Sequence, residues 1–163
     1  MLFSEELKSS TKRRAFLKKL KQQKKIQLIE TSTDICQAYL KKAKDFLRSA
    51  KVLHKEHLFE NAVVSSYYAM YNSVLGLLFF CGIKSENHTA SIILLTQLFE
   101  LESLSNTLLE VKKERIQKQY YTDSEENGSL QEESSQEIIQ TAEGFLLDIQ
   151  SFIDSLTSQD VEH

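Results

Sequence analysis

The residues best suited to chemistry lie in the segment KKERIQKQYYTD, residues 112–123. It sets the cations Arg115 and Lys118 close to two aromatic side chains, Tyr120 and Tyr121. A guanidinium can hold a phosphate and an aromatic ring can stack on a nucleobase. The segment therefore predicts a site for a nucleotide or RNA. The simpler alternative is that Arg115 pairs with a nearby acid while the tyrosines close the end of a helical bundle.

A second set of polar groups lies within an apolar segment, NAVVSSYYAMYNSVLGLLFFCG, residues 61–82. In a helix, Tyr67 and Tyr71 share one side, and Tyr68 is turned from Tyr67 by about 100°. A buried tyrosine ring still needs a partner for its hydroxyl. We therefore expect these side chains to lie beside a dimer seam, or near a cleft where Arg115 and His88 converge.

Other spacings that could carry chemistry have simpler explanations. His54, His57 and Glu60 follow one another at three-residue steps, but they fall in a predicted joint between helices and lack a fourth metal ligand. Arg48 and His54 are separated by five residues, as in some helical ribonucleases, and we attribute that match to chance. Glycine-rich phosphate loops and common hydrolase motifs are absent from the sequence. We expect no catalytic residue of these kinds, no metal and no cofactor.

The elements that would position these residues are helices. The chain has no proline, no tryptophan and only 4 glycines, so it lacks the residues that hairpins require and can sustain long helices. We expect an all-α fold, a four- to five-helix up-and-down bundle, with helices over about 31–54, 61–82, 89–100, 103–122 and 133–156. The predicted buried stripes are Ile35, Tyr39, Ala43, Phe46, Ala50 and Leu53 in the first helix, Ile92, Ile93, Leu95 and Phe99 in the third, and Ile138, Ala142, Phe145, Ile149 and Phe152 in the last.

Charge divides the chain near Glu30. Residues 1–30 hold nine basic and three acidic residues, whereas the remainder holds eleven and twenty. We interpret 1–30 as a basic extension, helical or disordered, 31–157 as the bundle, and 158–163 as a frayed tail. The extension could contact nucleic acid or an anionic partner through its charge, or pair with the acidic half of the chain.

The cysteines and the longest apolar run bear on location. Cys36 and Cys81 have no zinc-binding or disulfide-framework spacing and are expected to be buried thiols in a reducing cytoplasm. The run Val74–Ile83 is about half the length that spans a bilayer. We therefore expect a cytoplasmic protein that does not span a membrane.

The segment HLFENAVVSSYYAMYNSVLGLLFFCGIKSENHTASI resembles the HEPN domain, named for higher-eukaryote and prokaryote nucleotide binding, and in particular its small stand-alone prokaryotic members. The likeness rests on Ala62, the YYAM motif at 67–70 followed by Tyr71, and then Gly82, Lys84 and His88. The likeness extends over about residues 31–157. It includes an arginine, four residues and a tyrosine, which are Arg115 and Tyr120 here, and the pair Ala142 and Phe145 in the last helix.

The resemblance implies a helical bundle that dimerises and often works beside a small nucleotidyltransferase in toxin–antitoxin pairs. Family members with ribonuclease activity carry an arginine, four to six residues and a histidine. Here tyrosines stand at 120 and 121, and tyrosine is a poor general base at neutral pH because its pKa is about 10. This departure favours binding over cleavage.

The resulting hypothesis is a homodimeric protein that binds a nucleotide, RNA or a partner protein without catalysis, with no DNA as a partner. Arg115, Tyr120 and Tyr121 are the first candidates for the ligand site, and His88, Tyr68 and Lys118 are further ones. Two alternatives stay open. One is a metal-independent endoribonuclease toxin in which Tyr120 or His88 replaces the missing histidine. The other is a structural adaptor that docks through residues 1–30.

Overall fold

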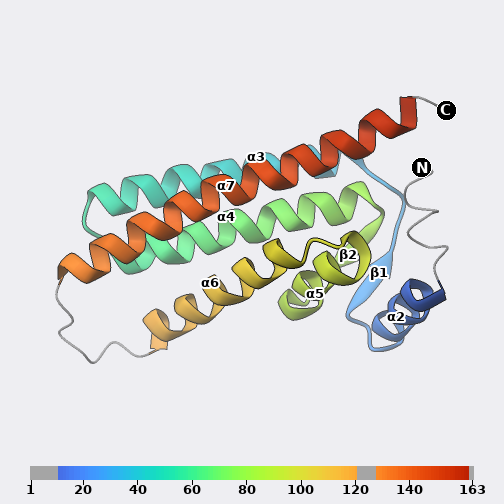
Figure 1. Ribbon diagram of the computed structural model, residues 1–163, viewed down its shortest axis with the longest axis horizontal. Coiled ribbons are helices and arrows are strands. Elements are labelled where there is room, and N and C mark those ends of the chain that lie inside the picture. Colours follow the sequence, from blue (N-terminus) through green and yellow to red (C-terminus); the bar gives the residue numbers. More distant parts are fainter. Residues whose placement is uncertain (1–10, 121–127, 162–163) are drawn as a thin grey trace.

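The computed structural model describes residues 11–120 and 128–161, and the side chains at 12–13, 117–120, 128–130 and 160–161 are outside the description. Within these ranges the protein is a bundle of six helices with one small antiparallel sheet (Figure 1). The expected all-α class is confirmed. The elements are α2 Thr11–Gln22, β1 Ile26–Leu28, α3 Thr33–Lys55, α4 Phe59–Phe80, β2 Ile83–Ser85, α5 His88–Phe99, α6 Glu102–Tyr120 and α7 Gly128–Val161.

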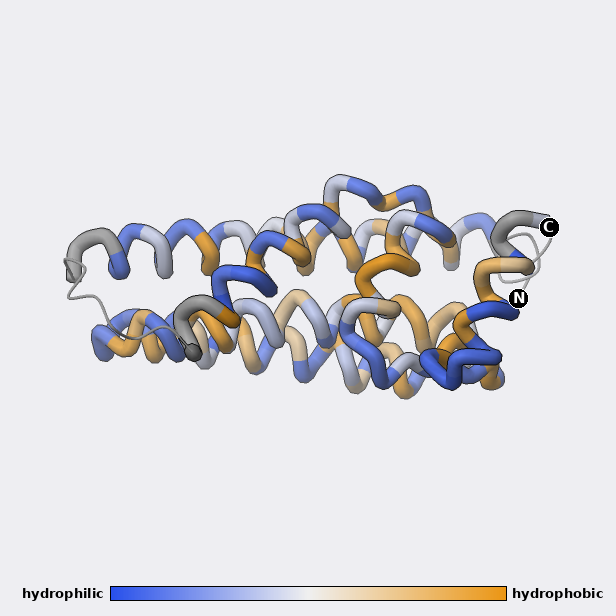
Figure 2. Tube along the Cα trace, turned by 90° about the horizontal axis from the view of Figure 1, so that it is seen from below, coloured by the Kyte–Doolittle hydropathy of each residue, from blue (hydrophilic) through white to orange (hydrophobic). Residues whose placement is uncertain are grey.

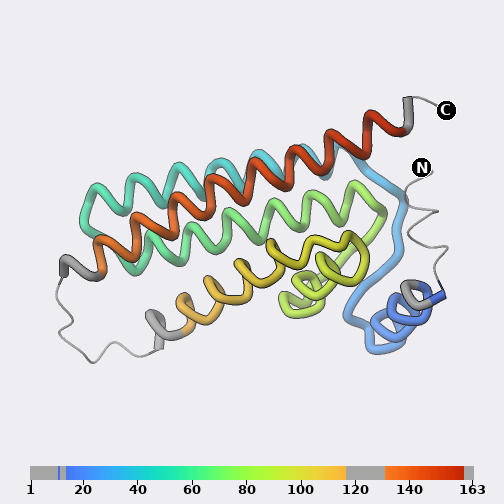
Figure 3. Tube along the Cα trace, in the orientation of Figure 1, coloured from blue at the N-terminus to red at the C-terminus, as the bar shows by residue number. Residues whose placement is uncertain are grey.

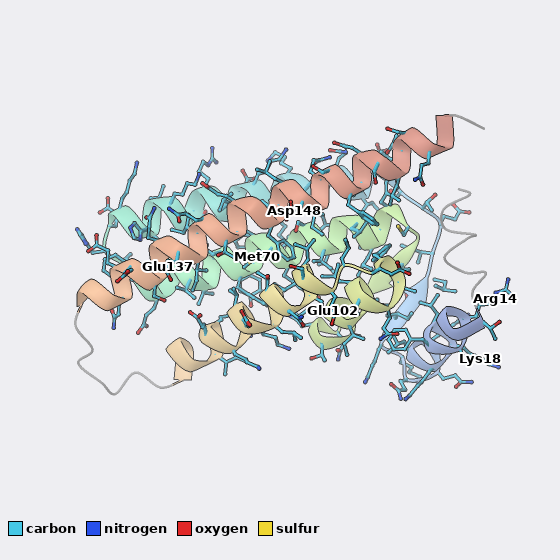
Figure 4. The ribbon with its side chains drawn as sticks, viewed as in Figure 1. Arg14, Lys18, Met70, Glu102, Glu137 and Asp148 are labelled. Atoms are coloured by element: carbon cyan, nitrogen blue, oxygen red, sulfur yellow. The ribbon has the colours of Figure 1, made fainter. Side chains whose placement is uncertain are left out.

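Helix α4 is the centre of the bundle. Figure 1 shows α3 and α7 on one side of it and α5 and α6 on the other. Apolar residues occur all around α4, and Met70, labelled in Figure 4, is fully buried. By length and composition α4 could cross a membrane, yet 83% of its most apolar stretch is buried inside the bundle. A helix at the centre of a bundle can be as long and as apolar as a membrane-spanning helix, because it has neighbours on every side.

Helix α3 packs on α4 through a stripe that differs slightly from the predicted one. Ser32 caps the helix by accepting a hydrogen bond from the Ile35 backbone N–H at 3.2 Å. The predicted Ile35 is 42% exposed, and Cys36 and Leu40 are buried in its place. The buried stripe at the start of α3 is therefore rotated by one residue from the predicted one. Periodicity cannot decide between two adjacent apolar residues such as Ile35 and Cys36.

Helices α3 and α7 are amphipathic, and Figure 2 shows hydrophobic and hydrophilic residues alternating along the helices of the bundle. In α7 the predicted core residues Ile138, Ala142, Phe145 and Ile149 are buried, and Phe152 is partly buried. The helix begins at Gly128 and runs to Val161, beyond both predicted ends. In α5, His88 is the first helical residue, and Ile93, predicted to be buried, is exposed.

Residues 11–30 are folded onto one end of the bundle, where α2 and β1 lie together (Figure 3). Leu17, Leu20 and Ile26 are part of the hydrophobic core. Strand β1 pairs with β2, with Ile26 opposite Ser85 and Leu28 opposite Ile83. The sequence predicted a helical or disordered extension here and no strand, because three-residue strands are too short to show a periodicity.

Gly82 makes the connection from α4 into β2 possible. Its φ is +77°, and its carbonyl accepts a hydrogen bond from the Ile29 backbone N–H at 2.9 Å. A Cβ at this position would stand 2.7 Å from the Ile29 carbonyl oxygen. Gly82 therefore ends α4 in the left-handed conformation that glycine favours, and brings residues 26–29 against the bundle.

Candidate functional site

The three α4 tyrosines direct their hydroxyls to side chains on other helices. The Tyr67 hydroxyl and His88 Nδ1 share a hydrogen bond of 2.7 Å. The Tyr68 hydroxyl accepts one from Arg115 Nη1 at 3.1 Å, and the Tyr71 hydroxyl lies 3.3 Å from the Ser91 hydroxyl. The polar groups of α4 therefore link it to the start of α5 and to α6, which explains why hydroxyls stand in an otherwise apolar helix.

Local sequence determines how His88 reaches this position. Asn87 caps α5 by accepting a hydrogen bond from the Ala90 backbone N–H at 2.8 Å, so the helix begins at the histidine itself. Below it, the Ser91 hydroxyl donates to the Ser85 hydroxyl at 2.8 Å and ties the helix start to β2. These bonds hold the first turn of α5 beside the tyrosines.

Arg115 extends from α6 across the faces of two tyrosine rings. Its guanidinium carbon lies 4.6 Å from the ring centroid of Tyr67 and 5.6 Å from that of Tyr68. Such stacking on a π face stabilises a cation. Within the described residues, the buried Nε of Arg115 has no hydrogen-bond partner and the guanidinium faces no carboxylate. The alternative that Arg115 pairs with an acid is therefore not seen in this part of the chain, and the guanidinium keeps donors for a ligand.

His88 is held between an aromatic face and two cations. Its ring stacks on Tyr71 with centroids 3.9 Å apart and an interplanar angle of 13°. Partial burial, followed by the positive charges of Arg115 and Lys112, lowers the pKa of His88 below its ordinary value. His88 is therefore neutral near pH 7, when a ring nitrogen can accept a proton or a hydrogen bond.

The hydroxyls of Tyr67 and Tyr71 stay protonated at neutral pH. Burial raises the pKa of Tyr67, although the Arg115 charge opposes that shift. Burial also raises the pKa of Tyr71, and its hydrogen bond with Ser91 opposes that shift. These groups can orient a ligand or the histidine, but they cannot serve as bases at neutral pH.

The fold brings together three of the candidate site residues, Arg115, His88 and Tyr68, from three different helices. The expected convergence of Arg115 and His88 beside the tyrosines is thus what the fold produces. The side chains of Lys118 and Tyr120, and the whole of Tyr121, lie outside the described residues.

Tyr67, which the sequence placed near the cleft, contacts both the histidine and the arginine. Sequence reasoning missed two further members of this cluster. Phe46 of α3 stacks on Tyr68 at 5.6 Å, and Lys112 donates to the Thr89 hydroxyl at 3.1 Å. Lys112 stands one helical turn before Arg115, which is a signal that the sequence does contain. No pattern in the sequence around Phe46 indicates its role in the cluster, because its partner Tyr68 lies on another helix.

The Arg48 and His54 pair has separate partners. Arg48 is exposed beside Asp45, with 3.7 Å between the charged groups, whereas His54 Nδ1 lies 3.0 Å from the Ser135 hydroxyl on α7. His57 follows α3 with φ +59° and contacts the edge of Phe59. These residues do not form a site with Arg115.

A comparison with protein families matches the HEPN domain over residues 36–151, well over half of the chain. The chain belongs to the HEPN family. HEPN domains occur in nucleotide-binding proteins and in ribonucleases. The matched range of this HEPN protein contains every described residue of the Arg115 cluster and excludes α2 and β1. No curated protein matches the chain.

Proposed function

We propose that this HEPN protein binds a nucleotide or a single-stranded segment of RNA at the cluster formed by Arg115, Tyr67, Tyr68, His88 and Lys112, and does not cleave it. The observation that carries the proposal is the guanidinium of Arg115, which is fixed over two tyrosine rings and faces no described carboxylate. A fixed guanidinium with donors to spare suits a phosphate group, and Lys112 adds positive charge nearby.

The test is the affinity of the purified full-length chain for a fluorescently labelled single-stranded RNA and for ATP at low salt. We expect Arg115→Ala to weaken binding about tenfold or more, because it removes a charge-assisted hydrogen bond to phosphate. Arg115→Lys keeps the charge but not the planar group, so we expect an intermediate affinity. The matched control is Lys113→Ala, which removes an exposed cation from the same helix. Equal affinities for the wild type and Arg115→Ala would refute the proposal.

A metal-independent endoribonuclease is the second candidate, and one observation favours it. Both Arg115 and His88 contact Tyr67, so an arginine and a neutral histidine stand near each other even though the motif histidine is missing. In such an enzyme His88 would take the proton from a ribose 2′-hydroxyl, and Arg115 would stabilise the charge that develops on the phosphate. Cleavage of RNA in EDTA that is lost in both His88→Gln and Arg115→Ala would establish this function and exclude pure binding.

We also propose that the chain has a nucleotidyltransferase as its partner. The HEPN family membership and the exposed basic residues of α2, among them Lys18 and Lys19, support a role in a toxin–antitoxin pair. Deleting residues 1–30 is a poor test because it removes Leu17, Leu20 and Ile26 from the core. The better variant is Lys18→Glu with Lys19→Glu, which reverses exposed charge and keeps the fold. We expect it to abolish co-purification of any nucleotidyltransferase that the wild-type chain retains; unchanged co-purification would exclude α2 as the docking arm.

A further inference from the structure

The hydrogen bond between Tyr67 and His88 fixes which nitrogen of the histidine ring carries the proton. The Tyr67 side chain is fully buried, and within the described residues its hydroxyl has His88 Nδ1 as its one hydrogen-bond partner. A buried hydroxyl that donated to nothing would lose its hydration without compensation. The Tyr67 hydroxyl therefore donates and Nδ1 accepts, so the proton of the neutral imidazole lies on Nε2.

In this tautomer His88 offers a ligand a hydrogen-bond donor. Its Nε2–H has no partner within the part of the chain that the structure describes, and the lone pair of Nδ1 is already used by Tyr67. A general base needs a free lone pair directed at the substrate. The tautomer therefore favours binding by His88 and disfavours the endoribonuclease in which His88 takes a proton.

The other polar groups of the cluster also present donors. Arg115 Nη1 donates to the Tyr68 hydroxyl at 3.1 Å, so that oxygen accepts and its own proton stays available. The guanidinium keeps further N–H groups, among them the buried Nε–H, which has no partner in the described residues. Lys112 uses one N–H on the Thr89 hydroxyl and keeps the rest.

These donors gather around the ring of Tyr67. The guanidinium carbon of Arg115 lies 4.6 Å from the ring centroid, and the His88 ring is stacked 6.0 Å from it at an angle of 17°. His88 is the first residue of α5, so the positive end of that helix dipole lies at the same place. No described carboxylate forms an ion pair with Arg115 or Lys112. The cluster thus combines positive charge with hydrogen-bond donors from three helices.

We propose that the cluster selects a terminal phosphate, the monoester at the end of an RNA strand or on a mononucleotide, over the diester inside a strand. This inference rests on the proposed function and names the group that the site recognises. A phosphate monoester carries a charge of about −1.5 to −2 at pH 7 and three strong acceptor oxygens. A diester has fewer free oxygens and a single charge, and a base edge carries donors that these side chains cannot accept. A set of donors with positive charge therefore matches the monoester best.

Binding of matched ligands to the purified full-length chain at low salt tests the proposal. One single-stranded RNA, labelled on an internal base, is compared with a 5′-phosphate, with a 3′-phosphate and with hydroxyls at both ends, and AMP is compared with adenosine. We expect a phosphorylated end to bind about tenfold or more tightly than the hydroxyl ends, because it adds charge-assisted hydrogen bonds. AMP should exceed adenosine for the same reason. AMP binding as tight as that of the phosphorylated strand would support the proposal and identify the free nucleotide as the source of the phosphate.

The same measurements separate this inference from the function on which it rests. Equal affinities for the three RNA ends, still lowered by Arg115→Ala, would overturn the inference and leave the proposed function standing. If none of the ligands binds, both are wrong. The matched control is Lys113→Ala, which removes an exposed cation from the same helix and should leave the preference for the phosphate unchanged.

Nitrogen–proton NMR spectra of the histidine rings test the tautomer in the wild type without a ligand, with His88 assigned by the signal that His88→Gln loses. We expect the proton on Nε2 and none on Nδ1 slightly above pH 7. A proton on Nδ1 would overturn the proposal, because His88 would then offer the ligand an acceptor. His88→Gln keeps an amide donor and should retain part of the preference for the phosphate, whereas His88→Phe keeps a ring without a donor and should lose more of it. The spectra and the wild-type affinities decide the matter even if His88→Phe does not fold.

Discussion

The hydrogen bond between Tyr67 and His88 offers the most direct test of the cluster, through the variant Tyr67→Phe. The Tyr67 side chain is fully buried, and its hydroxyl lies 2.7 Å from His88 Nδ1. Removing the oxygen leaves the ring in place but leaves Nδ1 without its protein partner. Such a loss costs about 1–3 kcal/mol, and partial access of water to the half-buried histidine places the expectation at about 1–2 kcal/mol.

Thermal and urea unfolding measure this cost. For a chain of this size, about 1–2 kcal/mol corresponds to a fall in Tm of about 2–8 °C. The matched control is Tyr39→Phe, since Tyr39 stacks on Phe79 and its hydroxyl makes no hydrogen bond within the described residues. We expect the control to stay within about 0.5 kcal/mol of the wild type.

A double-mutant cycle separates the bond from general effects of the substitution. The cycle pairs Tyr67→Phe with His88→Ala, and two residues in direct contact should show a coupling energy of about 0.5 kcal/mol or more. The reasoning is wrong if Tyr67→Phe costs no more than Tyr39→Phe, or if the two substitutions are additive.

Three further predictions concern the histidine, a glycine and a thiol. The pKa of His88 is lowered in the folded state from its ordinary value of 6.5. As the pH falls, the imidazole of the unfolded chain is therefore protonated before that of the folded chain, which favours unfolding. Stability should therefore decrease below about pH 6.5, and His88→Gln should lose that part of the pH dependence in melts recorded across this range. Gly82→Ala should cost at least about 1–2 kcal/mol, because φ is +77° and the Ile29 carbonyl oxygen is 2.7 Å from the new Cβ. Gly144→Ala should instead stabilise the protomer by up to about 1 kcal/mol in the same unfolding assay, and equal effects at the two glycines would contradict the backbone argument. Burial raises the pKa of the Cys36 thiol to about 11, so the thiol is protonated and enclosed at neutral pH. A thiol reagent should therefore modify Cys36 only at the rate at which the protein unfolds. Mass spectrometry at increasing urea concentrations measures that rate.

Sequence patterns predicted the helices well where many residues contribute to one periodicity. The stripe of α7 follows from apolar spacing over several turns. The helix ends were less accurate, since α7 begins at Gly128 and continues to Val161. A helix end depends on a few backbone hydrogen bonds, which a composition pattern does not report.

The candidate site was predictable in its residue types but not in its assembly. Arg115 drew attention as a cation beside aromatic residues in the sequence, and its described partners are instead Tyr67 and Tyr68, far away along the chain. Their meeting depends on how α6 packs on α4, and side-chain contacts between helices leave no local signature.

By itself the sequence determined the helical class and the apolar stripe of α7, because each depends on residues that are close together in the chain. It also contained the resemblance to the HEPN family. The tertiary structure alone decided that residues 11–30 join the core, that His88 lies among the tyrosines, and that basic α3 stands beside acidic α7. The physical reason is the same in each case. Local periodicity specifies which side of an element is apolar, whereas the packing of one element on another decides which polar groups meet.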